Sequence, residues 1–163
     1  MSSEIPSRPL PFEVSTHISI VASRYNERFT NALVDNCLAE LTEVLPNAKV
    51  NVIRVPGAFE VPVTVKAVAT QVSPAPSVVI ALGVIIQGST DHAALVGNSV
   101  TDSLLHIAVD TGIPVIHEVL LLDNETQAEE RCLGDKLNRG REAARCAAGM
   151  AELFLTRFSN PQS

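Results

Sequence analysis

The sequence predicts an α/β fold of three layers, an αβα sandwich with helices on both faces of a four-stranded parallel sheet. The first observation is that short β-branched segments alternate with longer segments of helical periodicity, an order typical of right-handed β-α-β crossovers. The second is composition, because 46% of the 163 residues are hydrophobic but only 4% are aromatic, and Trp is absent. Aliphatic strands that are apolar on both faces are typical of a parallel sheet covered by helices.

The first predicted strand covers His17–Ser23, which is rich in β-branched residues. We expect a helix next, capped near Asn26 and ended by Pro46. Its apolar residues recur every four positions, at Phe29, Leu33, Cys37, Leu41 and Leu45. Lys49–Val55 then alternates well enough to predict a second strand.

The segment Glu60–Val72 is ambiguous in its periodicity. Its β-branched residues favour a strand, but four of its valines fit one face of a helix: Val61, Val65, Val68 and Val72. We predict a helix, because two consecutive strands would leave no crossover for a parallel sheet.

The third predicted strand covers Ser77–Ile86. The helix that follows it is expected to end at Gly112, since glycine is favoured just beyond the last helical turn. Ile113–Leu122 is the fourth predicted strand.

Two helices are expected after the last strand. Asn124 and Gln127 have the spacing of a capping box, which predicts a helix start at Asn124. An Ala-rich segment then predicts a helix from Arg139 to about Phe158.

The order βαβαβαβαα, without internal repeats or linkers, predicts one flavodoxin-like domain over residues 13–159. Residues 1–12 carry three of the ten prolines and are expected to form an extended arm. Whether the arm adds an edge strand to the sheet stays open.

The composition disfavours several classes of protein. The net charge is −6, and neither a basic run nor interleaved aromatics mark a nucleic-acid surface. The histidines and three cysteines lack the spacing of metal ligands, and no nucleotide-binding motif is present, so no metal or cofactor is expected. No apolar run is long enough to span a membrane. Unpaired thiols without a signal peptide predict a cytoplasmic protein. Cys37 and Cys146 fall in the apolar patterns of predicted helices and are expected to pack against the rest of the protein.

The site is expected where the parallel strands end, because their carboxyl ends meet at one edge of the sheet. The segments at those ends are polar and several contain glycine: SRYNE, PGAFE, QGSTDH and HEVLLLDN. Gly88–Thr90 precedes a helix and could offer N–H groups to a phosphate, or it could be a simple capped turn. His92, in the first turn of that helix, could be a general base or a solvated histidine.

Other candidates have equally plain alternatives. Tyr25 could stack on a ligand ring or pack within the protein. Glu60 could accept hydrogen bonds from a ligand or simply stabilise a helix start. Arg131 and Arg139 could bind a phosphate or remain solvated.

Five segments, in order and spacing, resemble motifs of the 6,7-dimethyl-8-ribityllumazine synthase family. They are SRYNE, VIRVPGAFEVP, ALGVIIQGSTDH, TGIPVIHEVL and QAEERC…NRG, and the similarity covers Ile18–Leu155. The resemblance implies a transferase of riboflavin biosynthesis that condenses 5-amino-6-ribitylamino-uracil with 3,4-dihydroxy-2-butanone 4-phosphate, without metal or cofactor. It also implies a homo-oligomer, either a pentamer or a shell of twelve pentamers, with active sites between adjacent subunits.

The resemblance also implies residue roles. Tyr25 corresponds to the residue that stacks on the pyrimidine, and Asn26 lies beside it. His92 matches the proton-transfer group, and Arg131, from the adjacent subunit, matches the residue that pairs with phosphate. The other implied substrate-binding residues are Ala58, Phe59, Glu60, Val84, Ile85, Ile86, Ser89, Thr90, His117 and Arg139.

The sequence departs from the family pattern at two of these segments. Gln87 replaces a residue that is often basic, and His117 replaces one that is often Phe. The short GDKLN connection is compatible with a shell. A non-catalytic flavin-binding module or a structural shell protein on the same fold remains the alternative.

Overall fold

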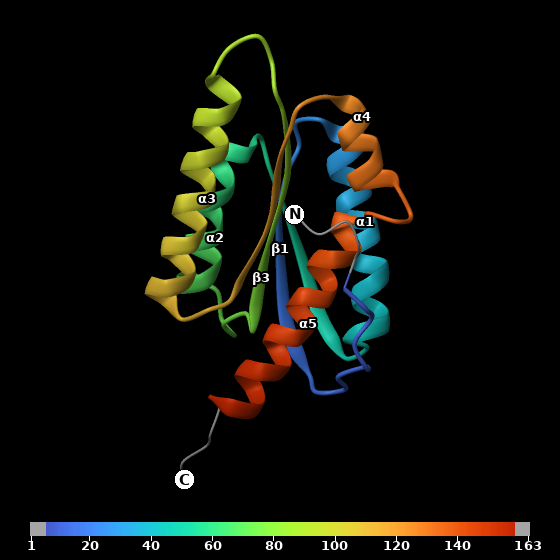
Figure 1. Ribbon diagram of the computed structural model, residues 1–163. Coiled ribbons are helices and arrows are strands. Elements are labelled where there is room, and N and C mark those ends of the chain that lie inside the picture. Colours follow the sequence, from blue (N-terminus) through green and yellow to red (C-terminus); the bar gives the residue numbers. More distant parts are fainter. Residues whose placement is uncertain (1–5, 159–163) are drawn as a thin grey trace.

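The computed structural model describes residues 6–158 and contains one four-stranded, all-parallel sheet in the order β2-β1-β3-β4 (Figure 1). The predicted fold class is therefore confirmed. The strands are β1 (Thr16–Ser23), β2 (Ala48–Val55), β3 (Val78–Ile86) and β4 (Val115–Leu122).

Two pairs of helices cover the sheet, one pair on each face (Figure 1). One face carries α1 (Glu27–Val44) and α5 (Arg139–Arg157), and the other carries α2 (Val61–Gln71) and α3 (His92–Thr111). Three short helical turns lie in the connections: the 3-10 turn η1 (Ala58–Glu60), α4 (Glu125–Ala128) and the π-helical turn η2 (Glu129–Leu133).

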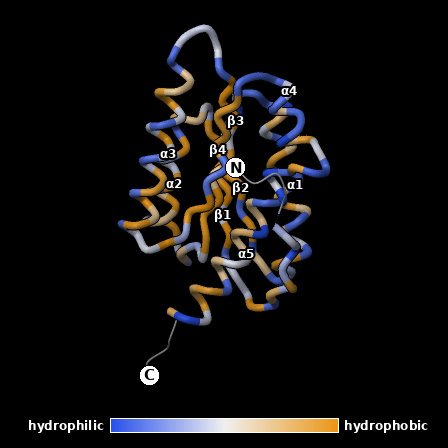
Figure 2. The backbone as a smooth tube through the Cα atoms, viewed as in Figure 1, coloured by the Kyte–Doolittle hydropathy of each residue, from blue (hydrophilic) through white to orange (hydrophobic). Residues whose placement is uncertain are grey.

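Each face of the sheet has its own core, because successive strand residues point to opposite faces. Ile20 and Leu82 pack toward α1 and α5, whereas Val21 and Ala81 pack toward α2 and α3. Figure 2 shows the strands as hydrophobic tubes and the helices with alternating hydrophobic and hydrophilic stretches. The central strands β1 and β3 are thus buried on both faces, as their aliphatic sequences predict.

Small residues let α5 approach α1 closely. A side chain added at Gly140 would place its Cβ 2.5 Å from the carbonyl oxygen of Leu33 and 3.0 Å from the Cβ of Asn36. The alanines of α5 that follow are buried: Ala143, Ala144, Ala147, Ala148 and Ala151. The Ala-rich composition of α5 therefore serves helix–helix packing as well as helix propensity.

Several element predictions are confirmed. The ambiguous segment forms α2, and Gly112 follows α3 with φ 67°. Asn124 accepts a hydrogen bond from the Gln127 N–H at 3.0 Å, but the Gln127 side chain accepts from Asp123 N–H at 3.0 Å instead of completing the predicted capping box. No strand precedes β1 within the described residues, so the open question of an added edge strand has a negative answer for residues 6–15.

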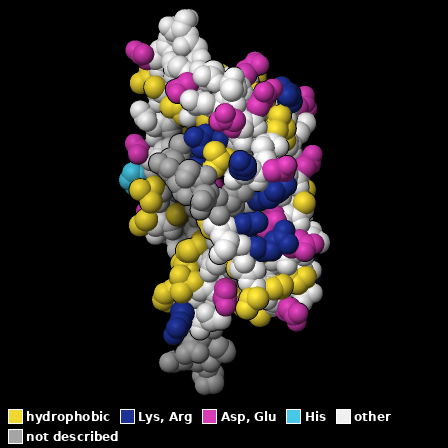
Figure 3. Space-filling model, turned by 45° about the vertical axis from the view of Figure 1, so that its right-hand side comes forward, with side chains coloured by type: hydrophobic (Ala, Val, Ile, Leu, Met, Phe, Trp, Pro, Cys, Tyr) yellow, Lys and Arg dark blue, Asp and Glu magenta, His cyan; other side chains and the backbone are white. Residues whose placement is uncertain are grey.

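The described part of the arm lies along α1. Phe12 N–H donates to the Val44 carbonyl at 3.0 Å, and the Arg8 guanidinium makes two 2.8 Å hydrogen bonds to the Glu40 carboxylate. Glu40 is 3% exposed and also accepts from Arg145 Nε at 2.7 Å. Figure 3 shows Lys and Arg side chains beside Asp and Glu on this side of the molecule. Residues 1–5 of the predicted arm and residue 159 lie outside the described residues.

The cysteines follow the packing prediction only in part. Cys37 is fully buried between α1 and the sheet, and Cys132 is buried in η2. Cys146 is exposed, so the prediction that it packs against the rest of the protein is wrong. The buried stripe of α5 is occupied by its alanines, which leaves position 146 outside that stripe.

Candidate active site

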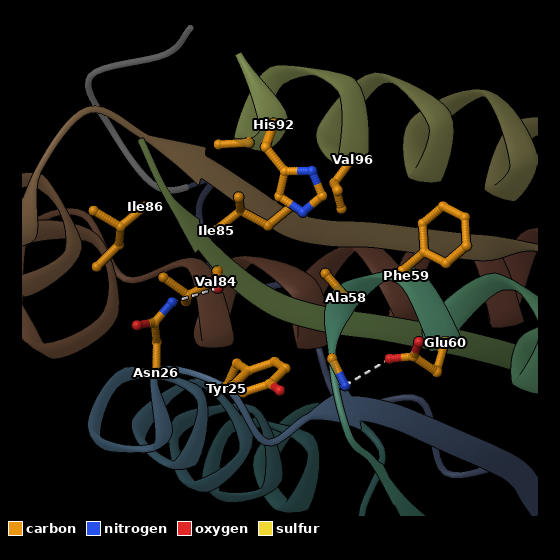
Figure 4. Close-up of a pocket in the computed structure, with 12 residues that line it drawn as sticks. Tyr25, Asn26, Ala58, Phe59, Glu60, Val84, Ile85, Ile86, His92 and Val96 are labelled. Atoms are coloured by element: carbon orange, nitrogen blue, oxygen red, sulfur yellow. Dashed lines mark hydrogen bonds between the residues drawn. The ribbon is translucent and has the colours of Figure 1, made fainter. Parts of the chain in front are cut away.

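A pocket of about 290 Å³ lies at the carboxyl ends of β1 and β3 (Figure 4). It is lined from three places in the chain: the segment after β1, the η1 turn, and the β3 end with the start of α3. The lining residues are Tyr25, Asn26, Gly57, Ala58, Phe59, Glu60, Val84, Ile85, Ile86, His92, Ala93 and Val96. Most of the predicted site residues therefore lie together at the carboxyl ends of the strands, as predicted.

Tyr25 presents an exposed ring to this pocket. The residue is 72% exposed, so the alternative of internal packing does not hold for most of the ring. One edge of the ring lies against Gly57, where an added Cβ would be 3.0 Å from Tyr25 Cδ2. The N–H groups of Arg24 and Tyr25 both donate to the Pro56 carbonyl at 3.2 Å. The segments after β1 and β2 are thus held together under the ring.

Asn26 connects two strand ends and does not cap α1 with its side chain. The residue has φ 55°, in the left-handed region, and its backbone carbonyl accepts from Phe29 N–H at 2.9 Å. Its side-chain amide donates to the Val84 carbonyl at 2.8 Å. Asn26 is the N-cap residue of α1, as predicted, but its side chain makes no capping hydrogen bond because the amide is used across the pocket (Figure 4).

Phe59 and Glu60 form the η1 side of the pocket. Phe59 is 64% exposed, and the Glu60 carboxylate accepts a hydrogen bond from Gly57 N–H at 2.8 Å. Glu60 therefore stabilises the start of a helical turn, which is the second of the two roles considered for it. A carboxylate offers about four acceptor positions, so it retains capacity for a ligand.

His92 is the first residue of α3 and its side chain is exposed. Figure 4 shows its ring next to Ile85 and Val96, on the side of the pocket opposite Tyr25. Sequence reasoning missed Gly57, Ala93 and Val96. Val96 could have been found, because residues four apart share one face of a helix.

The Gly88–Thr90 loop is exposed and does not line the pocket. The Gln87 side-chain amide holds this loop by donating to the carbonyls of Gly88 at 3.2 Å and Thr90 at 2.7 Å. Gln87 thus closes the loop that leads into α3.

The remaining predicted residues lie elsewhere, in a second pocket of about 300 Å³ along β4. Its lining includes His117, Glu118, Arg131 and Arg139. Within one chain, the structure does not bring these side chains together with Tyr25 or His92.

Comparison with known proteins identifies the family. A model of the 6,7-dimethyl-8-ribityllumazine synthase family matches residues 15–154. The chain belongs to the 6,7-dimethyl-8-ribityllumazine synthase family. The prediction of an enzyme, a transferase of riboflavin biosynthesis, is therefore confirmed.

Individual members of the family are similar over most of their length. The 6,7-dimethyl-8-ribityllumazine synthase of Polaromonas sp. strain JS666 is 39% identical over 138 residues, which are 84% of this chain and 86% of that protein. The enzyme of Paraburkholderia phymatum is 40% identical over 83% of this chain and 76% of that protein. That of Thermococcus kodakarensis is 37% identical over 84% of this chain and 85% of that protein.

His117 is held by hydrogen bonds within the chain. Val119 N–H donates to its Nδ1 at 3.1 Å, so the neutral ring carries its proton on Nε2. That Nε2–H donates to Thr101 Oγ1 at 2.8 Å, and the Thr101 hydroxyl donates to the Gly97 carbonyl at 2.9 Å. Burial lowers the pKa of His117, which favours this neutral form.

Two arginines give the second pocket its positive charge. Nε and Nη1 of Arg131 are buried and have no hydrogen-bond partner in the described part of the chain. Arg139 forms an ion pair with Glu142. Burial and the nearby Glu142 raise the pKa of Glu118 to about 7, although Arg139 and Arg131 act in the opposite direction.

The described residues form neither a metal-binding cluster nor a membrane-spanning helix. No group of His, Cys, Asp and Glu residues in range 6–158 is arranged to hold a metal ion. Each helix within residues 6–158 is too short or too polar to span a lipid bilayer.

Proposed function

We propose that the chain condenses 5-amino-6-ribitylamino-uracil with 3,4-dihydroxy-2-butanone 4-phosphate, giving 6,7-dimethyl-8-ribityllumazine, phosphate and water. This is the penultimate step of riboflavin biosynthesis. Family membership supports the proposal. The observation that carries it is the first pocket, where the Tyr25 ring, the Glu60 carboxylate and the His92 imidazole line one apolar cavity.

The pyrimidine substrate fits the exposed rings and acceptors of this pocket. The flat heterocycle would stack on Tyr25, since offset stacking of aromatic rings is favourable. Glu60 and the backbone of Ala58 and Phe59 would hold the ribityl chain and ring, and Val84, Ile85 and Ile86 would line the ring pocket. Asn26 shapes the floor through its bond to Val84.

His92 would transfer protons between intermediates. The substrate amine attacks the ketone and loses water to give an imine, and phosphate leaves by elimination. The second amine then attacks the remaining carbonyl and loses a second water, which closes the ring of the lumazine. Each step moves a proton, so one imidazole next to the ring can serve as both acid and base. Holding two substrates in contact supplies the larger part of the acceleration.

The phosphate end of the site would be shared between subunits. Ser89 and Thr90 lie in the loop before α3, whose N-terminal N–H groups favour an anion. Arg131, Arg139 and His117 line a different pocket of the same chain. We propose that an adjacent subunit supplies them, in a pentamer or in a shell of twelve pentamers.

Two further assignments belong to this proposal. Residues 1–12 would be an arm and residues 13–159 the catalytic domain, which agrees with the family match over residues 15–154. The three cysteines are free thiols, which suits a reducing cytoplasm.

The test is the formation of lumazine, followed by absorbance with purified full-length protein and both substrates. A control without protein is essential because the reaction also proceeds slowly unaided. Clear acceleration, with sedimentation velocity to give the subunit number, would support the proposal. Tight binding of lumazine or riboflavin without acceleration would favour a non-catalytic binding or shell protein instead.

A further inference from the structure

Glu118 is a carboxyl group that the proposed mechanism leaves without a role. It lines the second pocket together with Arg131 and Arg139. Its neighbours two residues away, Ile116 and Leu120, pack toward α1 and α5, and alternate strand residues share a face. Glu118 therefore points to the α1 and α5 side, away from the side on which His117 bonds to Thr101.

The charged groups around Glu118 come from three elements. From α5, Glu142 repels the carboxylate and Arg139 attracts it; from η2, Arg131 attracts it. The thiols that interact with it are Cys37 from α1, Cys132 from η2 and Cys146 from α5. Burial raises the pKa of Cys37 and Cys132 to about 12, so these two thiols stay protonated near neutrality.

Glu118 and an incoming anion would compete for the same cations. Arg139 already pairs with Glu142, and the Nε and Nη1 groups of Arg131 have no hydrogen-bond partner among residues 6–158. An ionised Glu118 would therefore repel a phosphate at Arg131 in a partly buried pocket, where charges are weakly screened. A protonated Glu118 would not.

We infer that Glu118 is a positioning residue that couples anion binding at Arg131 and Arg139 to the uptake of one proton. The inference rests on the proposed role of Arg131 as the phosphate-binding group. An anion held by the arginines offsets their attraction for the carboxylate and adds its own repulsion, so the proton on Glu118 is held more tightly in the complex. Affinity for a dianion is highest when Glu118 is protonated and falls as the pH rises above the pKa of about 7.

Inorganic sulfate is the suitable probe, since it does not titrate between pH 6 and 9. Isothermal titration calorimetry on the assembled full-length protein, in two buffers of different ionisation enthalpy, gives both the affinity and the number of protons taken up. For the wild type we expect proton uptake and an affinity that falls by up to about tenfold per pH unit above neutrality. Glu118→Gln should bind sulfate with an affinity that changes much less over this range.

Two more variants locate the effect. Glu142→Gln removes a repulsive charge, so the pH midpoint of sulfate binding should move down while the slope persists. Arg131→Ala should weaken sulfate binding at every pH. Sulfate binding unaffected by Arg131→Ala, a wild type without proton uptake, or a Glu118→Gln protein that keeps the full pH slope would each overturn the inference.

The lumazine assay separates this inference from the proposed function. Proton-linked sulfate binding without lumazine formation would overturn the activity and leave the role of Glu118 standing. Lumazine formation without proton-linked sulfate binding would support the activity and overturn the role of Glu118. Proton uptake is measured on the wild type alone. The inference can therefore be tested even if the Glu118→Gln protein folds poorly.

Discussion

The side-chain amide of Asn26 donates a 2.8 Å hydrogen bond to the carbonyl oxygen of Val84. Asn26 directly precedes α1, and Val84 lies near the carboxyl end of β3, so this bond fixes the floor of the pocket across two strand ends. Asn26 also has φ 55°, a conformation that asparagine tolerates better than most residues.

Asn26→Gly and Asn26→Ala should separate these two roles. The glycine variant loses only the hydrogen bond, which should lower the free energy of unfolding by about 1 kcal/mol. The alanine variant should lose about 1–2 kcal/mol more, because alanine is strained in the left-handed backbone conformation. Urea unfolding of the two variants gives the free energies directly. Equal destabilisation by both would show that backbone conformation contributes nothing at this position.

His92→Ala should lower kcat by less than about 100-fold, the lower end of what a positioned acid–base group contributes. Steady-state kinetics of lumazine formation measures it. His106→Ala is a matched control, because His106 is an exposed histidine of the same helix and does not line the pocket. A His92→Ala enzyme with wild-type kcat would remove the proton-transfer role.

Arg131→Ala should raise KM for the butanone phosphate by about 10- to 100-fold, the worth of a hydrogen bond to a charged group, and leave KM for the pyrimidine nearly unchanged. Folding stability should change little, since Nε and Nη1 have no hydrogen-bond partner in the described chain. Arg28→Ala, which removes an exposed arginine on α1, is the control. A rise in KM for both substrates alike would argue against a phosphate-specific role.

Gly140→Ala and Gly149→Ala should have opposite effects although both lie in α5. An added Cβ at Gly140 would come within 2.5 Å of the Leu33 carbonyl oxygen, and such overpacking costs about 1–3 kcal/mol. At Gly149 the Cβ would meet nothing within 4 Å, so alanine should stabilise the helix by about 0.5–1 kcal/mol. Thermal unfolding gives both values, and a stable Gly140→Ala protein would contradict the close α1–α5 contact.

Glu40→Gln should destabilise the protein by about 1.5–3 kcal/mol, the worth of hydrogen bonds between charged groups, because it removes the charge of a buried carboxylate that pairs with Arg145 and with the half-exposed Arg8. The hydrogen bonds from Arg8 hold the pKa of Glu40 below its ordinary 4.5, assisted by Arg145. A lowered folded-state pKa means that the stabilisation is present above pH 4.5 and is lost as the pH falls below that value.

Urea unfolding at pH 7 and pH 4 checks the Glu40 prediction. The wild type should lose more stability between these conditions than Glu40→Gln. Glu43→Gln provides the exposed control, since Glu43 lies 3.6 Å from Arg8 and its side chain is 59% exposed. An equal loss of stability in wild type and Glu40→Gln would exclude Glu40 as a source of acid sensitivity.

Much of the first pocket could be predicted because parallel strands end at one edge of a sheet. Tyr25, Glu60 and His92 each follow a different strand, so their meeting required only the strand assignments. His117 could not be placed in this way. It pairs in register with Ala81, three residues before Val84 on β3, and therefore lies too early in β4 to reach that edge.

The sequence by itself determined the order of strands and helices, the aliphatic core and the family. Periodicity and composition suffice for the element order and the core, whereas the family rests on the resemblance of five motifs. Only the tertiary structure decided that the Asn26 amide bonds Val84, that His117 bonds Thr101, and that Glu118 shares a pocket with Arg131 and Arg139. Periodicity tells which face of an element a side chain occupies, but the partner on the facing element depends on how distant segments pack.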